Sequence, residues 1–277
     1  MTTTAAVPVF DNGTGSYIRI SGTQHMEAVS SMPDWLAQML HNLILTGQCT
    51  DITLELNDSL MTQVLDSGTV STSSDFVLAG TCTTSFQTSG ANRSNNIAVG
   101  ASRLNNLIVM PGQTISVSDT ILPRTRANGY KEAGVYVNGA HTTGLGGGVC
   151  QISSTVYNAV KNAGLTVVQR NPHSMPVSYL PKGLDAAIAA GSKDLKFRND
   201  YTTPVVLYTD TSNKHLTVNV LVWNQELAGR SFKLWAKQTG ALSADTYFTT
   251  YLNGKEISTQ FVGTSRYNPY REAVNDD

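Results

Sequence analysis

The stretch GLGGGVCQISSTVYNAVKNAG, residues 144–164, carries the strongest helix signal in the chain. Apolar residues recur after Cys150 at the spacing of one helix face, and Gly164 stands where a helix would end. These apolar residues are Ile152, Val156, Ala159, Val160 and Ala163. The spacing predicts a helix over 150–163, entered from a glycine loop that places Cys150 in its first turn.

The sequence on both sides of this helix indicates mostly strands. Ser31 is a cap for a helix that ends before Gly47, and a further helix is predicted over 92–104. Asn138-Gly139 predicts a hairpin turn. Strands are predicted over 17–20, 51–56, 114–117, 165–169, 176–180, 196–208, 215–223, 231–236, 247–252 and 256–262.

This order of elements predicts an α+β fold, with a mixed or antiparallel sheet around a central helix that starts at a catalytic Cys150. A Ser- and Thr-rich run over 67–75 predicts a linker. We therefore expect a small N-terminal α+β domain over 1–75 and a catalytic domain over 76–224. A β-rich C-terminal extension is expected over 225–277.

Composition excludes some classes of function. The 277 residues are 40% hydrophobic with a net charge of −1 and no basic run, so nucleic-acid binding is not expected. No apolar run approaches the roughly 18 residues that cross a membrane, and the start lacks the basic region of a signal peptide. Either the protein is cytoplasmic or an export segment or anchor lies outside this sequence, and the abundance of Thr, Ser, Asn and Gly favours the second. We expect a monomer without a cofactor.

Cys150 has three readings: a nucleophile, a buried structural residue or half of a disulfide. The chain has three cysteines, and a pair between Cys49 and Cys82 would leave Cys150 as the free thiol. The exposed N–H groups of a helix start stabilise a thiolate and can hold an oxyanion. We therefore predict that Cys150 is the nucleophile and that backbone N–H groups from Gly148 to Gln151 hold the oxyanion.

A cysteine nucleophile needs a base, and the chain has five histidines. His173 is favoured because it lies in a loop between two prolines, just after the strand that follows the Cys150 helix. His141 is the main rival, nine positions before Cys150. Asp185 and Asp194 are candidates to orient the histidine. The other three histidines, His25, His41 and His215, are expected to be structural or surface residues.

Substrate contacts are predicted from polar residues near these motifs. Arginine can clamp a substrate carboxylate with two parallel hydrogen bonds, and the loop arginines are Arg93, Arg124, Arg126 and Arg198. The residues predicted to bind substrate are Arg124, Arg198, Ser153, Ser174 and Tyr130. A phosphate loop is disfavoured because no Gly-Lys-Ser/Thr follows the glycines, and a zinc site because no Cys-x-x-Cys is present. No metal is expected.

Several ordered runs resemble the VanW domain over about residues 80–210. They are TSFQTSGANRSNNIAVGASRLNN, VMPGQTISVSDTILPRTRANGYKEAGVYVNG, GLGGGVCQISSTVYNAV, RNPHSMPVSYLPKGLDA and DLKFRND. Residues 10–60 more weakly resemble the peptidoglycan-binding domain that often precedes it. The tail from about 225 resembles the β extension found before a G5 module in some relatives.

The resemblance implies an exported, wall-associated protein of a Gram-positive-type bacterium, and its name comes from a glycopeptide-resistance cluster. Some members of the family are reported as L,D-transpeptidases that depend on a cysteine, and Cys150 stands at the matching position. The family's usual RHPHS reads RNPHS here, which keeps His173. The family's usual PPGRDA reads PKGLDA, so Leu184 replaces an arginine and any substrate-binding role of that arginine is missing.

The residues and the resemblance together predict a peptidoglycan L,D-transpeptidase that forms 3-3 cross-links. Its partners would be two stem peptides, one as acyl donor and one as acceptor, and transfer to water would give L,D-carboxypeptidase activity. Two other classes stay open. One is a wall-binding protein without catalysis, and the other is a cysteine peptidase or amidase that cuts stem peptides.

Overall fold

The structure, a computed structural model, describes the backbone of residues 3–7, 17–22, 51–56, 76–137, 140–189 and 191–270. Side chains are described over 77–135, 142–189 and 191–270. The chain divides into two compact units, Met1–Phe76 and Val77–Asp277. Among the described residues, no helix has the length and apolar character needed to span a membrane.

The first unit contains a three-stranded sheet in the order β1-β2-β3. Its strands are β1 (Thr3–Val7), β2 (Tyr17–Gly22) and β3 (Asp51–Leu56). β2 pairs antiparallel with β1 and parallel with β3. The strands predicted over 17–20 and 51–56 are therefore present, whereas the helix predicted to start at Ser31 lies outside the described residues.

The described residues of the second unit form four sheets with mostly antiparallel pairing. The largest has the order β4-β12-β11-β5, from β4 (Phe76–Ser85), β12 (His215–Trp223), β11 (Val205–Asp210) and β5 (Leu107–Val109). A second has the order β6-β10-β9, from β6 (Thr114–Ser116), β10 (Lys196–Arg198) and β9 (Thr166–Gln169). β7 (Glu132–Val137) and β8 (Ala140–Leu145) form a hairpin. The prediction of an α+β fold with mostly antiparallel sheets is confirmed.

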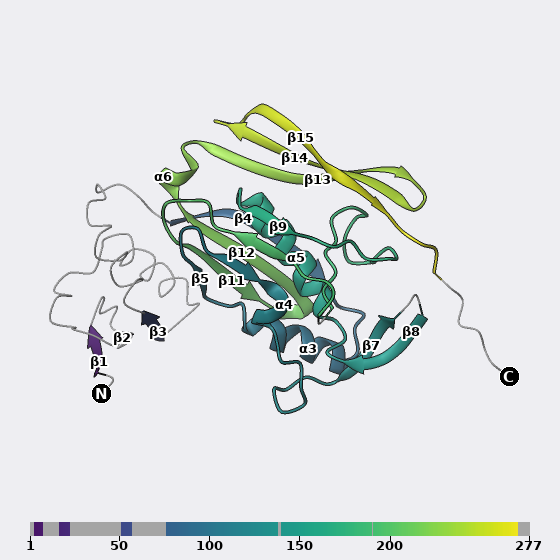
Figure 1. The fold of residues 1–277 in the computed structure, drawn as a ribbon, viewed down its shortest axis with the longest axis horizontal. Helices are drawn as coiled ribbons and strands as arrows, with labels where there is room; N and C mark the ends of the chain where they lie inside the picture. The colour runs from purple at the N-terminus through teal and green to yellow at the C-terminus, as the bar shows by residue number, and fades with distance from the viewer. Residues whose placement is uncertain are drawn as a thin grey trace. The chain divides into compact units, whose positions relative to one another are not determined.

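The predicted C-terminal extension forms a meander of three long strands within this second unit. β13 (Arg230–Gly240), β14 (Ser243–Leu252) and β15 (Lys255–Arg266) pair in sequence order. A short helix, α6 (Asn224–Leu227), joins them to β12. β13 packs on the long helix α5 (Val149–Asn162), which lies between this meander and the four-stranded sheet (Figure 1).

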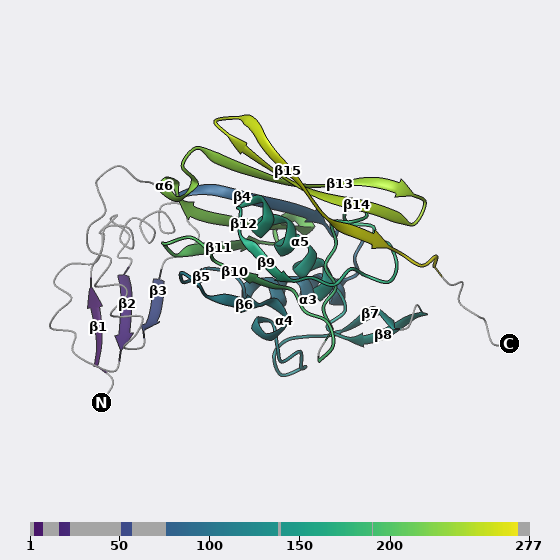
Figure 2. The same cartoon turned by 45° about the horizontal axis from the view of Figure 1, so that its top comes forward.

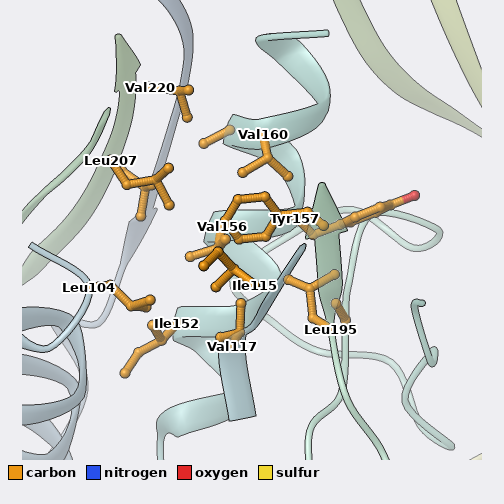
Figure 3. Packing of buried hydrophobic residues seen from close by; sticks show 14 of the residues in the cluster. Leu104, Ile115, Val117, Ile152, Val156, Tyr157, Val160, Leu195, Leu207 and Val220 are labelled. Carbon is orange, nitrogen blue, oxygen red and sulfur yellow. The ribbon is translucent and has the colours of Figure 1, made fainter. Parts of the chain in front are cut away.

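Helix α5 is buried around nearly its whole circumference. It also contacts α3 (Ala91–Ser102) and β9, so sheets and a second helix surround it. Val156 and Val160 pack with Leu207 and Val220 of the four-stranded sheet (Figure 3). The sequence predicted one buried apolar face, but the polar face is also buried, and its side chains are hydrogen-bonded. Because α5 is buried on all sides, the residues of its first turn are held in a fixed position.

Two predicted strands differ in the structure. The strand predicted over 196–208 is divided into β10 and β11, because the buried side chain of Asn199 bonds to Val109 O and Thr203 O and holds a loop between them. Residues 176–180 form an irregular segment instead of a strand. Pro176 and Pro181 flank that segment, and neither has an N–H to donate to a sheet. A short helix, α4 (Val117–Thr120), follows β6 where the strand was predicted to end.

Candidate active site around Cys150

The glycine loop is shaped by close packing before α5 begins. A Cβ on Gly147 would lie 2.5 Å from the carbonyl oxygen of Gly134 in β7, so no side chain fits there. Gly148 is the N-terminal cap of α5 with φ of 110°, a conformation that other residues rarely adopt. The glycines are therefore required by packing and by backbone conformation. Their effect is to deliver Cys150 as the second residue of α5.

Cys150 faces a loop and a histidine at this helix start. Its half-buried thiol lies 3.3 Å from the carbonyl oxygen of Ile188 and is hydrogen-bonded to the side chain of His173. The structure thus brings together the two residues that the sequence predicted as nucleophile and base. The rival His141 lies on β8, and its side chain is outside the described residues.

Asp185 completes a chain of three side chains. Its Oδ2 accepts hydrogen bonds from the backbone N–H of His173 at 2.7 Å and from the ring Nδ1 at 2.8 Å. An ionised carboxylate only accepts, so Nδ1 carries a proton and Nε2 is the ring nitrogen left for Cys150. Cys150, His173 and Asp185 therefore have the connectivity of a nucleophile, a base and an orienting carboxylate.

Polar residues of α5 hold the loop that carries Asp185. Ser153 Oγ donates to Ala186 O, and Asn158 Nδ2 donates to Leu184 O at 2.7 Å. The backbone N–H of Ala186 donates in return to Ser154 Oγ at 2.9 Å. The same helix therefore positions the thiol through its first turn and the carboxylate through its buried polar face.

The pKa shifts of the three groups agree with an ion pair. Burial alone would raise the pKa of Cys150, but the hydrogen bond and charge of His173, a backbone hydrogen bond at Ile188 and the charge of Arg124 bring it below its usual value. Burial would lower the pKa of His173, yet Asp185 and Cys150 raise it to about 9. Burial opposes ionisation of Asp185, but hydrogen bonds from His173 and Tyr267 and the charge of Arg170 lower its pKa to about 2.

The signs of these shifts define a pH window. The imidazolium persists up to about pH 9, and the thiolate persists down to the lowered pKa of Cys150. At pH values between these two limits the pair is ionic. Cys150 is thus expected as a thiolate beside a protonated His173, the form in which a cysteine is most reactive.

Two arginines surround the thiol. The charge of Arg124 acts on Cys150, and its side-chain carbons lie along Gly146 at the start of the loop. Arg93 of α3 also interacts with the charge of Cys150, and its guanidinium donates to Ser89 Oγ and to Gln151 Oε1. Arg124 was predicted to bind substrate, and it lies where a carboxylate near Cys150 would meet a positive charge.

Three predicted site residues have structural roles instead. Tyr130 is buried with its hydroxyl donating to Ile121 O, and Ser153 is buried with its hydroxyl on Ala186 O, so neither reaches a substrate. The backbone N–H of Gln151 donates to Gly148 O at 3.0 Å, which removes it as an oxyanion donor. Its side chain is buried and donates to Thr84 Oγ1 and Ser85 O. Among the described residues, the backbone N–H of Cys150 makes no backbone hydrogen bond and replaces it as the candidate donor.

The remaining predictions divide between the site and distant surfaces. Ser174 is exposed beside His173, so it can contact a bound peptide. Arg198 forms a surface ion pair with Asp200. In the sheet it lies opposite Thr166, the first residue of β9, whereas His173 follows the other end of that strand. Asp194 accepts from Ser116 Oγ and the Ser118 N–H, so it caps α4 and does not orient a histidine.

Other cysteines, histidines and arginines named from the sequence lie apart from this chain of groups. Cys82 is a free thiol on β4, and burial raises its pKa to about 12. Cys49, His25 and His41 lie outside the described residues, whereas His215 of β12 contacts Asn213 O. Arg126 forms an exposed pair with Glu132. In the described part of the chain, no group of three or more His, Cys, Asp or Glu side chains could hold a metal ion.

Sequence reasoning missed two groups that support Asp185. Arg170 Nε donates to the backbone O of Asp185 at 2.7 Å and its Nη2 lies 3.3 Å from Oδ1. Tyr267 donates its hydroxyl proton to the same oxygen from beyond the end of β15. Arg170 could have been found, because it stands in the RNPHS run with His173. Tyr267 has no comparable local signal.

The protein class follows from comparison with known sequences. Residues 92–221 match a family model described as VanW like protein, and this range contains Cys150, His173 and Asp185. This region of the chain is therefore similar to the VanW-like family. No solved structure matches it.

Two relatives match part of the chain. YoaR of Bacillus subtilis (strain 168) is 42% identical over 128 residues, 46% of this chain and 42% of the relative. The vancomycin B-type resistance protein VanW of Enterococcus faecalis (strain ATCC 700802 / V583) is 36% identical over 114 residues, 39% of this chain and 42% of the relative. The chain thus matches less than half the length of each.

Proposed function

We propose that this protein acts on the bacterial cell wall as a cysteine-dependent L,D-transpeptidase of peptidoglycan stem peptides. The observation that carries the proposal is the hydrogen-bonded series Cys150, His173 and Asp185 at the start of a buried helix. A substrate in the cell wall is supported by the VanW-like region and by the similarity to the Enterococcus relative, which is named as a vancomycin B-type resistance protein. An extracellular, wall-associated location follows from that substrate.

The first half-reaction is acyl transfer to the thiol. The Cys150 thiolate attacks the carbonyl carbon of the third stem residue, and a carbon–sulfur bond forms as the amide bond to the terminal D-Ala breaks. His173 gives its Nε2 proton to the departing amine. The Cys150 N–H points from the first turn of α5 and stabilises the oxyanion, since helix-start N–H groups carry partial positive charge.

The second half-reaction transfers the acyl group to another stem. The side-chain amine of the acceptor's diamino acid attacks the thioester carbonyl, a new amide bond forms, and the carbon–sulfur bond breaks. His173, now neutral, takes the proton released by the amine, which restores the thiolate–imidazolium pair. Water in place of the amine gives a shortened stem and L,D-carboxypeptidase activity.

The two arginines suit the charge of the donor stem. A tetrapeptide stem ends in the carboxylate of D-Ala, one amide bond away from the carbonyl that Cys150 attacks. Arg124 carries a positive charge near the thiol, and Arg93 does so from α3. A terminal carboxylate bound there would place the preceding carbonyl at the thiolate, because arginine holds carboxylates in a fixed geometry.

Purified tetrapeptide muropeptides test the proposal directly. The full chain is incubated with them at neutral pH, and products are separated and weighed by mass spectrometry. Cross-linked dimers that have lost one D-Ala are expected. Stems cut at another bond would instead identify a peptidase or amidase. Unchanged stems, together with co-sedimentation of the protein with intact sacculi, would identify a wall-binding protein.

A further inference from the structure

The end of the C-terminal meander lies against the loop that carries His173. We call residues Ser265–Tyr270 the C-terminal strap; Figure 2 shows the chain continuing past the end of β15 toward the C-terminus. The Asn268 N–H donates to Ser174 O at 2.7 Å, and the Tyr270 hydroxyl donates to Pro176 O. The strap therefore contacts Ser174 and Pro176, which lie one and three positions after His173.

Tyr267 is the member of the strap that reaches the site. It is 6% exposed, and its backbone N–H is anchored on Leu242 O at 2.8 Å. Its hydroxyl accepts the Gly183 N–H at 2.7 Å and donates to Asp185 Oδ1. A hydroxyl that is fixed by one donor can present its own proton in only a narrow range of directions.

Both carboxylate oxygens of Asp185 therefore have partners that hold them in place. His173 occupies Oδ2 through its backbone and its ring, whereas Tyr267 and Arg170 occupy Oδ1. Arg170 is itself tied to the strap, because its Nη1 donates to Ser265 Oγ at 3.0 Å. Without the strap, Oδ1 would keep only the Arg170 contact at 3.3 Å, and the carboxylate could rotate about its bond to Cβ.

We propose that Tyr267 is a positioning residue that holds Asp185 against His173 and thereby sets the thiolate content of Cys150. The proposal rests on the thiolate–imidazolium pair of the proposed function. The matched family region ends at residue 221, so in this chain the site is completed by a tyrosine 46 positions further on (267 − 221 = 46). The C-terminal meander is then part of the active site, in addition to covering α5.

The pH dependence of Cys150 alkylation tests this role. The full chain is treated with iodoacetamide from pH 5 to pH 10, and the peptide that contains Cys150 is quantified by mass spectrometry so that other thiols do not interfere. Tyr267→Phe is expected to slow alkylation about three- to tenfold at pH 6, because a hydrogen bond to a charged group is lost. At pH 10 the rates of variant and wild type should converge, since the thiol is ionised in both.

Tyr270→Phe is the matched control, because it removes another hydroxyl of the strap, the one that donates to Pro176 O. Its profile should follow the wild type. Ser265→Ala is a second variant that loosens Arg170 and Tyr267 without removing the Tyr267 ring, and a smaller slowing, about twofold at pH 6, is expected. If circular dichroism shows that Tyr267→Phe does not fold, Ser265→Ala still tests the proposal.

Two results would overturn the proposal. One is a Tyr267→Phe profile that superimposes on the wild type, and the other is a rate lowered by the same factor at every pH, which would mean changed access to the thiol. Alkylation requires no stem peptide, so its outcome is separate from the muropeptide assay. Failure to form dimers with a fast-reacting wild-type Cys150 would contradict the proposed function alone.

Discussion

Cys150→Ala is expected to abolish both cross-linked dimers and the release of D-Ala, by about 10⁴-fold or more, because removal of a nucleophile leaves only substrate binding and oxyanion stabilisation. The variant should fold, since the lost thiol is small and half-buried and alanine is a good helix former. The measurement is dimer formation from tetrapeptide muropeptides, with circular dichroism to confirm folding.

Cys82→Ala is the matched control for this variant. Cys82 packs against the core from β4, and burial raises its pKa to about 12, so it stays a neutral thiol at working pH. Its loss should leave dimer formation within about twofold of the wild type, because a neutral buried thiol is inert. Dimers formed by Cys150→Ala at the wild-type rate would contradict the assignment of the nucleophile.

Asp185→Asn is expected to lower kcat by about 10²- to 10⁴-fold with a smaller effect on KM, since the orienting carboxylate acts through the histidine and not on substrate binding. The amide presents one oxygen and one nitrogen to partners that all donate, so either His173 or the Tyr267–Arg170 side loses its acceptor. The pKa of His173 should fall from about 9 toward its usual value. As the pH is lowered, the thiolate should therefore be lost at a higher pH in the variant than in the wild type.

Asp194→Asn separates this effect from a general loss of a carboxylate. Asp194 caps α4 through Ser116 and Ser118, so its replacement should affect thermal stability but not the pH profile of the reaction. Steady-state kinetics from pH 5 to pH 9 on both variants distinguishes the two aspartates. Equal losses of kcat in the two variants would show that Asp185 has no special role.

The sequence predicted the helix, with Cys150 in its first turn, because these signals are local. Apolar spacing after Cys150 and the stop at Gly164 determine α5 without any distant residue. His173 was predicted because a strand returning from the helix brings its loop back to the helix start, and the structure places it there. Asp185 was one of two candidates, and only the tertiary contacts distinguish it from Asp194.

The predictions that failed depend on contacts between distant segments. Tyr130 and Ser153 are polar residues near the motifs, but their hydroxyls bond to carbonyl groups inside the core. The N–H of Gln151 forms a tight turn with Gly148, a detail of the helix start that residue types do not show. Tyr267 lies 82 positions from Asp185, so no sequence pattern joins the two.

Trapping the acyl intermediate is the measurement that tests the central claim most directly. The full chain is mixed briefly with a tetrapeptide stem that lacks a usable acceptor amine, quenched in acid, and digested for mass spectrometry. The Cys150 peptide should gain the mass of the stem without its terminal D-Ala, and Cys150→Ala should gain none. An adduct on another residue, or stems shortened at full rate by Cys150→Ala, would contradict a thioester mechanism at Cys150.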